Sequence, residues 1–392
     1  MREVVIVSGM RTPIGDFLGA LKDFSAVQLG TIALKAAIEK AGIDPALIEE
    51  VATGHVYQAG CKGNPSRQVG IYAGCPVETV CVTVNQQCPS GMRALEMISQ
   101  EIMLGKIDIG AAVGIESMTN VPYLQLKART GFRMGPATVE DGMLYDALID
   151  AFFNYHQGIT AENLAEKYSV TRQEQDEWSL RSHQRACAAI KDGKFKDEIV
   201  PIEIKSKKGT KIFDTDEHPN PNLTMEILAS LKPAFKKEGT VTAGNASSIN
   251  DAACAAIVMA ADKAAELGIK PLARIVVTAS ASVAPEIMGF GVVPAVNRAL
   301  KLADMKPDDI DLWELNEAFA AQVIACNREL KIDPAIINVN GSGCSLGHPV
   351  GNTGLRLIIA AINELKRRNQ KFGMASLCAG GGPAMATIIE VL

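Results

Sequence analysis

The sequence has no long apolar run and no excess of basic residues. No stretch approaches the roughly 20 apolar residues that cross a bilayer, so we expect no membrane partner. The formal net charge of −5 argues against a nucleic-acid partner, because phosphate binding needs a basic surface. The N-terminus also lacks the apolar region and cleavage site of a secretory signal. These absences predict a cytoplasmic globular protein.

The nine cysteines show no paired spacing and no CxxC or His/Cys cluster with zinc spacing. An odd number of unpatterned cysteines without a signal sequence is typical of reduced thiols in the cytoplasm. We therefore predict no bound metal. Five cysteines have apolar or alanine-rich neighbours and are expected to be small buried side chains; they are Cys75, Cys81, Cys187, Cys254 and Cys326.

Two halves of the chain resemble each other in their order of apolar strands and amphipathic helices. The segment Ser90 to Ile98 (SGMRALEMI) matches Thr353 to Ala361 (TGLRLIIAA), and a glycine follows each start by twenty residues, at Gly110 and Gly373. Strands that alternate with helices predict parallel sheets with helical crossovers. The pattern indicates a duplicated α/β fold, although any two strand–helix units share some likeness.

The middle of the chain, roughly residues 119–250, is richer in charge and turn residues. It contains a lysine-rich segment at 205–211 and one strong helical pattern that follows Thr171 as N-cap. We interpret this region as an excursion inserted into the first half. Such excursions over a rigid sheet commonly bind ligands.

Cys88 follows the apolar strand Val80 to Val84 and precedes an amphipathic helix that ends near Gly105. Pro89 suits the first position of that helix and keeps Cys88 out of the helical region. A sulfur at a helix N-terminus is stabilised as thiolate, so Cys88 is a candidate nucleophile. A structural cysteine at the end of a strand is the alternative.

His348 lies in a glycine-rich loop (CSLGHPVGNTG) before another amphipathic helix, at the repeat position that matches Cys88. Imidazole is the usual base that activates a thiol, which makes His348 the candidate base. A surface histidine is the alternative reading, and Cys344 in the same loop is a rival nucleophile.

Cys378 ends a second apolar strand and runs into three glycines, 380–382, whose backbone N–H groups could form an oxyanion hole. Asn316, in the segment ELNEAFA, could orient a water or cap the following helix. Two cysteines and a histidine in such turns indicate covalent sulfur chemistry on an acyl group.

With these residues in place, the chain resembles the thiolase family, acetyl-CoA acetyltransferase type, over its whole length. The resemblance rests on motifs that occur in family order: VIVSGMRTPIG, YHQGITAENLA, KPAFKKEGTVTAGNASSIND, WELNEAFA, NVNGSGCSLGHPVG and LCAGGGPA. It implies a duplicated five-layered α/β/α/β/α fold with an N-terminal domain (residues 1–268) that carries a loop domain at about 119–250, and a C-terminal domain (269–392). It also implies a homodimer or homotetramer.

The resemblance further implies a reversible Claisen condensation of two acetyl-CoA to acetoacetyl-CoA and CoA, with these thioesters as substrates and no cofactor. Cys88 would be the nucleophile that carries the acyl group, and His348 would activate Cys88. Cys378 would be the acid/base that transfers the α-proton of acetyl-CoA. Asn316 would hold a water in one oxyanion hole, and backbone N–H groups of Cys88 and Gly380 would form the other. Positions that match the pantetheine and acyl pocket are His156, Gln157, Phe235, Ala243, Ser247 and Met288.

The chain departs from the family pattern at four positions. Pro89 replaces a small residue, Gln157 replaces methionine, Asn220 replaces an arginine that often holds the coenzyme A nucleotide, and Phe290 replaces a smaller residue. Gln157 and Phe290 motivate an alternative, a broader 3-ketoacyl-CoA thiolase. A non-catalytic thiolase-like binding subunit is a remote third reading. If Cys88 and Cys378 share a pocket, mild oxidation is expected to join them.

Overall fold

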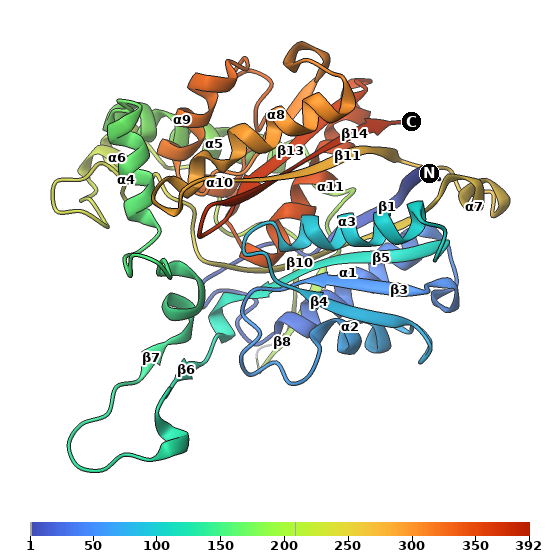
Figure 1. Cartoon of the computed structure of the whole chain (residues 1–392), viewed down its shortest axis with the longest axis horizontal. Coiled ribbons are helices and arrows are strands. Elements are labelled where there is room, and N and C mark those ends of the chain that lie inside the picture. The colour runs from blue at the N-terminus through green and yellow to red at the C-terminus, as the bar shows by residue number, and fades with distance from the viewer. Residues whose placement is uncertain (1, 208) are drawn as a thin grey trace.

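The computed structural model describes residues 2–207 and 209–392. Residue 1 and residue 208, the latter within the lysine-rich segment 205–211, lie outside the described residues. Two stacked sheets carry the fold, as Figure 1 shows, and they join at one edge where Val5 and Ile6 pair with Arg274 and Ala273. The hydrogen-bonded strand order is β12-β13-β14-β11-β1-β10-β5-β3-β4, with β2 (Gly15–Asp16) beside β10.

The N-terminal half supplies one sheet and the C-terminal half the other. The strands of the first are β1 (Val4–Arg11), β3 (Glu50–Gly54), β4 (Val80–Val84), β5 (Ile109–Ser117) and β10 (Asn250–Ala260). Those of the second are β11 (Ala273–Ser282), β12 (Leu312–Leu315), β13 (Phe372–Cys378) and β14 (Pro383–Val391). Both halves thus repeat one strand plan, as the internal repeat predicts.

Helices form three layers around the two sheets. The middle layer is α3 (Ser90–Met103) and α11 (Val350–Arg368), which contact each other and one sheet on either side. The outer layers are α1 (Ala26–Ala41) and α2 (Pro65–Ala73) below the first sheet, and α8 (Val292–Ala303) and α9 (Ala320–Leu330) beyond the second (Figure 1). The five-layered α/β/α/β/α fold is therefore confirmed.

The middle helices pack through glycines at matching repeat positions. A Cβ on Gly91 would lie 2.8 Å from the Gly351 carbonyl oxygen, and one on Gly354 would lie 2.9 Å from the backbone nitrogen of Met92. Because glycine lacks a Cβ, the two helix backbones approach closely at their N-terminal ends. This contact brings the starts of α3 and α11, and hence the Cys88 and His348 turns, to the same place.

The prediction of parallel sheets is wrong for most strand pairs. Among the strands of the described residues, only the pairs β3–β4, β3–β5 and β12–β13 are parallel, while β1, β10, β11 and β14 pair antiparallel with their neighbours. The chain enters the sheet at β10 after the long excursion and at β14 after the short glycine turn, and neither connection is a helical crossover. Strand direction is therefore set by these connections.

The excursion between β5 and β10 consists of short elements and two longer helices. It includes β6 (Tyr123–Leu124), β7 (Glu140–Asp141), α4 (Gly158–Lys167), α5 (Arg172–Lys191), the hairpin β8 (Ile202–Ser206) and β9 (Gly209–Phe213), and α6 (Met225–Ser230). Thr171 caps α5 as predicted, in a capping box with Glu174. An arm that carries β6 and β7 projects from the body (Figure 1).

No helix in the described part of the chain is both long and apolar enough to cross a membrane.

Candidate active site

A cavity of about 600 Å³ opens between the two halves and the excursion. It brings together most of the residues that the sequence singled out. Those that line it are Cys88, His156, Gln157, Phe235, Ala243, Ser247, Met288, His348 and Gly380. Residues from both halves of the fold and from the excursion therefore share one space.

Cys88 lies between the end of β4 and the start of α3. The preceding residue, Gln87, has a left-handed φ of 57°, and Pro89 is the N-cap of the helix, which therefore begins one residue later than predicted. The backbone N–H groups of Gly380 and of Cys88 itself are directed at the sulfur and favour the thiolate. Burial outweighs them and raises the pKa of the Cys88 thiol to about 12. The expectation of a resting thiolate is therefore wrong, and Cys88 needs a base.

His348 is buried, and a hydrogen bond to Nδ1 holds its ring. Its Nδ1 lies 2.7 Å from Thr353 Oγ1, while the Thr353 hydroxyl donates to the Pro349 carbonyl oxygen at 3.1 Å. This pattern assigns the proton to Nδ1 and leaves Nε2 free to accept one. Burial, with a smaller contribution from the cation of Arg356, lowers the pKa of His348 to about 3. The ring is therefore neutral, as a base must be.

Two polar residues that the sequence analysis missed hold the His348 loop. Asn250 Oδ1 accepts the His348 backbone N–H at 2.9 Å, and Glu116 Oε2 accepts the Gly351 N–H at 2.9 Å. Glu116 also accepts the N–H groups of Val56 and Tyr57. These residues come from β5 and β10, so no local pattern around His348 could have indicated them.

Cys378 and Asn316 are the two remaining side chains of the predicted catalytic set. Cys378 ends β13 as predicted and is buried; burial and then the charge of a Cys88 thiolate raise its pKa well above the usual range. Asn316 Nδ2 lies 3.4 Å from His348 Nε2, and its Oδ1 is buried without a partner among the described residues. Asn316 does not cap the next helix, because α9 begins at Ala320 with Phe319 as N-cap.

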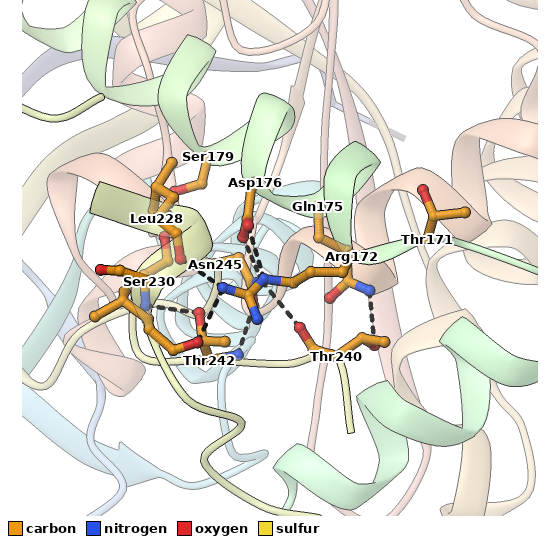
Figure 2. A network of polar contacts seen from close by, with 12 residues as sticks. Thr171, Arg172, Gln175, Asp176, Ser179, Leu228, Ser230, Thr240, Thr242 and Asn245 are labelled. Atoms are coloured by element: carbon orange, nitrogen blue, oxygen red, sulfur yellow. Dashed lines mark hydrogen bonds and ion pairs between the residues drawn. The ribbon is translucent and has the colours of Figure 1, made fainter. Parts of the chain in front are cut away.

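Helix α5 fixes the loop that carries Ala243 and Ser247 to the cavity wall. Asn245 Nδ2 donates to Asp176 Oδ1 at 2.8 Å, and Gln175 Nε2 donates to Thr240 Oγ1 at 2.9 Å, as Figure 2 shows. Within the loop, the Thr242 N–H donates to Asn245 Oδ1 at 2.8 Å. The polar positions of α5 thus serve as a fixed support for a substrate-facing loop.

Several residues that the sequence analysis considered for the site do not line the cavity. Phe290 stacks on Tyr168, with ring centroids 5.1 Å apart, and does not line the cavity. Cys344 is buried in the core with its sulfur toward the Glu317 carbonyl, so it is not a rival nucleophile at the cavity. Neither Asn220 nor the described lysines of 205–211 line the cavity either.

The cysteines expected to be buried differ among themselves. Cys75, Cys254 and Cys326 are buried, but Cys81 and Cys187 are only half-buried. All nine are free thiols. Over residues 2–207 and 209–392, no group of three or more His, Cys, Asp or Glu side chains is placed to hold a metal ion.

Family models match almost the whole chain. The model described as thiolase, N-terminal domain, matches residues 4–262, and the model described as thiolase, C-terminal domain, matches residues 269–391. Residues 119–250, the excursion, fall within the N-terminal match. The two matches meet near the point where the first half of the fold ends and β11 begins.

Curated proteins and solved structures agree with these matches. An acetyl-CoA acetyltransferase of Pseudomonas aeruginosa is 49% identical over 98% of both chains. The structure of acetyl-CoA acetyltransferase from Syntrophomonas wolfei is 48% identical and superimposes with a TM-score of 0.98 over all of both chains. Human mitochondrial 3-ketoacyl-CoA thiolase is 41% identical, with a TM-score of 0.97 over 100% of this chain and 99% of that one.

Proposed function

This chain belongs to the thiolase family, and on that premise we propose that it is an acetyl-CoA acetyltransferase, which joins two acetyl-CoA into acetoacetyl-CoA and CoA and also runs the reverse thiolysis. Full-length relatives at 45–49% identity carry that name, whereas the 3-ketoacyl-CoA thiolase is 41% identical. The observation that carries the mechanism is the shared cavity of Cys88, His348 and Gly380.

In the first half-reaction the Cys88 sulfur attacks the acetyl carbonyl carbon of acetyl-CoA. His348 Nε2 takes the thiol proton as the S–C bond forms, since the buried thiol is protonated at rest. The carbonyl oxygen becomes an oxyanion that the N–H groups of Cys88 and Gly380 stabilise, and each such donor is typically worth about 3 kcal/mol. The C–S bond to coenzyme A then breaks, and the leaving thiolate takes the proton from His348.

In the second half-reaction Cys378, whose raised pKa keeps it a thiol at rest, gives its proton to His348 and, as thiolate, removes an α-proton from a second acetyl-CoA. The resulting enolate oxygen is held by His348 and by a water on Asn316, whose buried Oδ1 has no protein partner in the described structure. The carbanion attacks the acetyl thioester on Cys88 and forms the new C–C bond. The C–S bond to Cys88 breaks, the Cys88 sulfur takes the proton from His348, and Cys378 keeps the α-proton, so both cysteines end as thiols.

Thiol, imidazole and backbone donors supply every step, so the proposed reaction uses no metal or organic cofactor. Incubation with EDTA and extensive dialysis should leave the rate of acetoacetyl-CoA thiolysis unchanged. The proposed place of action is the cytoplasm, where a catalytic thiol stays reduced.

Thiolysis of acetoacetyl-CoA, followed by loss of the enolate absorbance, tests the proposed function. We expect turnover by the chain alone and a preference for this substrate over 3-ketohexanoyl- and 3-ketooctanoyl-CoA. Cys88→Ala should lower kcat by about 10⁴-fold or more, as loss of a covalent nucleophile does. Cys187→Ala is the matched control, since Cys187 is a half-buried thiol on α5 outside the cavity. Full activity of Cys88→Ala would contradict the mechanism.

We also propose a homo-oligomer, a dimer or a tetramer. The projecting arm exposes several large apolar side chains, and an exposed apolar group of this kind commonly marks a protein interface; they are Tyr123, Leu126, Phe132 and Met134. Strand β4 is a free sheet edge with Val80 largely exposed. Light scattering after gel filtration should show two or four chains, and Met134→Glu should shift the distribution toward smaller species if the arm is the interface.

A further inference from the structure

The side chain of Gln157 is the unexplained polar group of the cavity. It is only 7% exposed, and its Oε1 is buried without a hydrogen-bond partner among the described residues. No protein group in the described structure accepts from its Nε2 either. A buried amide oxygen without a partner costs free energy, so a site that retains one is suited to a ligand that donates a hydrogen bond to it.

Hydrogen bonds hold the backbone of Gln157 at the cavity wall. The Gln157 N–H donates to the Leu148 carbonyl oxygen at 2.8 Å, and its carbonyl accepts from both the N–H and the hydroxyl of Thr160. The residue immediately precedes α4, whose first residue, Gly158, packs against the ring of Phe235. Because both ends of the residue are held, the Cα of Gln157 is fixed at the cavity wall.

The amide lies beside the group that holds the acyl carbonyl. A Cβ on Gly380 would lie 2.7 Å from Gln157 Nε2, so the amide nitrogen sits against the Gly380 backbone. The Gly380 N–H in turn is directed at the Cys88 sulfur. An acyl chain carried on Cys88, with its carbonyl oxygen at Gly380, must therefore pass the Gln157 amide.

The other residues that line the cavity determine which charge an acyl chain can carry beside Gln157. Among the described residues, no lysine or arginine lines the cavity, and burial lowers the pKa of the nearby His156, which keeps that ring neutral. A second amide, Gln87, lines the cavity on the other side of the nucleophile, while Leu148 and Met288 are apolar. A carboxylate would lie there without a counter-charge, whereas a hydroxyl can both donate to Oε1 and accept from Nε2.

We propose that Gln157 is a specificity-determining residue that makes this site accept 3-ketoacyl thioesters whose acyl chain carries a neutral hydroxyl group. The inference rests on the proposed function, because it concerns the acyl group bound to Cys88. In thiolysis, Cys88 attacks C3 of the substrate, the C2–C3 bond breaks, and acetyl-CoA leaves after Cys378 protonates its α-carbon. The hydroxyacyl group on Cys88 is then transferred to coenzyme A.

Matched substrate pairs test the proposal in the wild-type enzyme. The pairs are 5-hydroxy- against 5-methyl-3-oxohexanoyl-CoA, and 6-hydroxy-3-oxohexanoyl- against 3-oxoheptanoyl-CoA, in which a hydroxyl replaces a methyl of similar size. We expect kcat/KM to favour the hydroxyl member of at least one pair by about tenfold or more, since a site built to hydrogen-bond rejects an analogue that lacks the group. Equal or faster turnover of the methyl member in both pairs would overturn the proposal.

Two variants test whether Gln157 causes the preference for hydroxyl over methyl substrates. Gln157→Met should lower the hydroxyl-to-methyl ratio of kcat/KM by about tenfold or more, and persistence of the wild-type ratio in this variant would overturn the role of Gln157. Met288→Leu alters the shape of the cavity without changing its polarity, so both members of each pair should respond alike. A faster reaction of 3-oxohexanedioyl-CoA than of either hydroxyl substrate would also contradict the proposal, because its terminal carboxylate is charged.

Failure of this inference is distinguishable from failure of the proposed function. Acetoacetyl-CoA has no chain beyond C4, so its thiolysis by the wild type reports on the catalytic group alone. Turnover of acetoacetyl-CoA together with a preference for methyl substrates would refute only the role of Gln157. Absence of turnover on every substrate would refute the thiolase mechanism itself.

Discussion

Thr353 Oγ1 accepts a hydrogen bond from His348 Nδ1 at 2.7 Å, and its hydroxyl donates a hydrogen bond to the Pro349 carbonyl oxygen. The hydroxyl is therefore a fixed acceptor toward the ring, and it leaves Nε2 unprotonated on the side that faces Asn316. Thr353 lies one turn into α11, a helix whose N-terminus follows the histidine loop directly. The helix thus sets the tautomer of the base as well as its position.

Substitution Thr353→Val removes this acceptor while it keeps the shape of the side chain. We expect kcat for acetoacetyl-CoA thiolysis to fall by about 10-fold to 100-fold, since an unsatisfied buried donor costs about 1–3 kcal/mol. KM should change little, because Thr353 does not line the cavity. Thr353→Ser retains the hydroxyl and should recover most of the rate. A similar loss in both variants would show that packing, and not the hydroxyl, matters.

Alkylation by iodoacetamide should report the protonation of Cys88. Burial raises the pKa of this thiol to about 12, so the thiolate fraction should increase about tenfold per pH unit from pH 7 to pH 10 without a plateau. Labelling is read by mass spectrometry of the peptide that contains Cys88. A plateau below pH 8 would mean that His348 and Cys88 form a thiolate–imidazolium pair before substrate binds.

The close helix contact predicts a large effect of one methyl group. A Cβ on Gly354 would lie 2.9 Å from the Met92 backbone nitrogen, so Gly354→Ala must push α3 and α11 apart. We expect a loss of about 1–3 kcal/mol in the free energy of unfolding, measured by urea denaturation. Gly63→Ala is the control, because a Cβ there meets no atom within 4 Å. Equal stability of the two variants would contradict this account of the helix contact.

Mild oxidation should inactivate the enzyme through its two site thiols. A Cys88 thiolate acts electrostatically on Cys378, which places the two sulfurs near each other, and an added oxidant such as diamide would take up the two electrons and two protons released. Mass spectrometry should find a Cys88–Cys378 crosslink that dithiothreitol reverses together with activity. Inactive protein without this crosslink would exclude the mechanism.

The local sequence predicts much of the secondary structure. The strand Val80 to Val84 occurs with the predicted bounds, and Thr171 caps its helix. These features depend on apolar periodicity and on contacts within a few residues, which the sequence contains in full. The repeat also predicts that Cys88 and His348 occupy matching turns, because a duplicated fold places matching positions symmetrically.

The tertiary structure alone decides strand direction, protonation and the choice among thiols. Most strands are antiparallel because of how the excursion and the glycine turn return the chain to the sheet, and Cys344 is turned into the core while Cys88 faces the cavity. The helix N-terminus predicts a thiolate at Cys88, yet burial raises its pKa. Burial, and the contacts of Glu116 and Asn250 with the histidine loop, depend on packing between distant segments, and no local pattern encodes them.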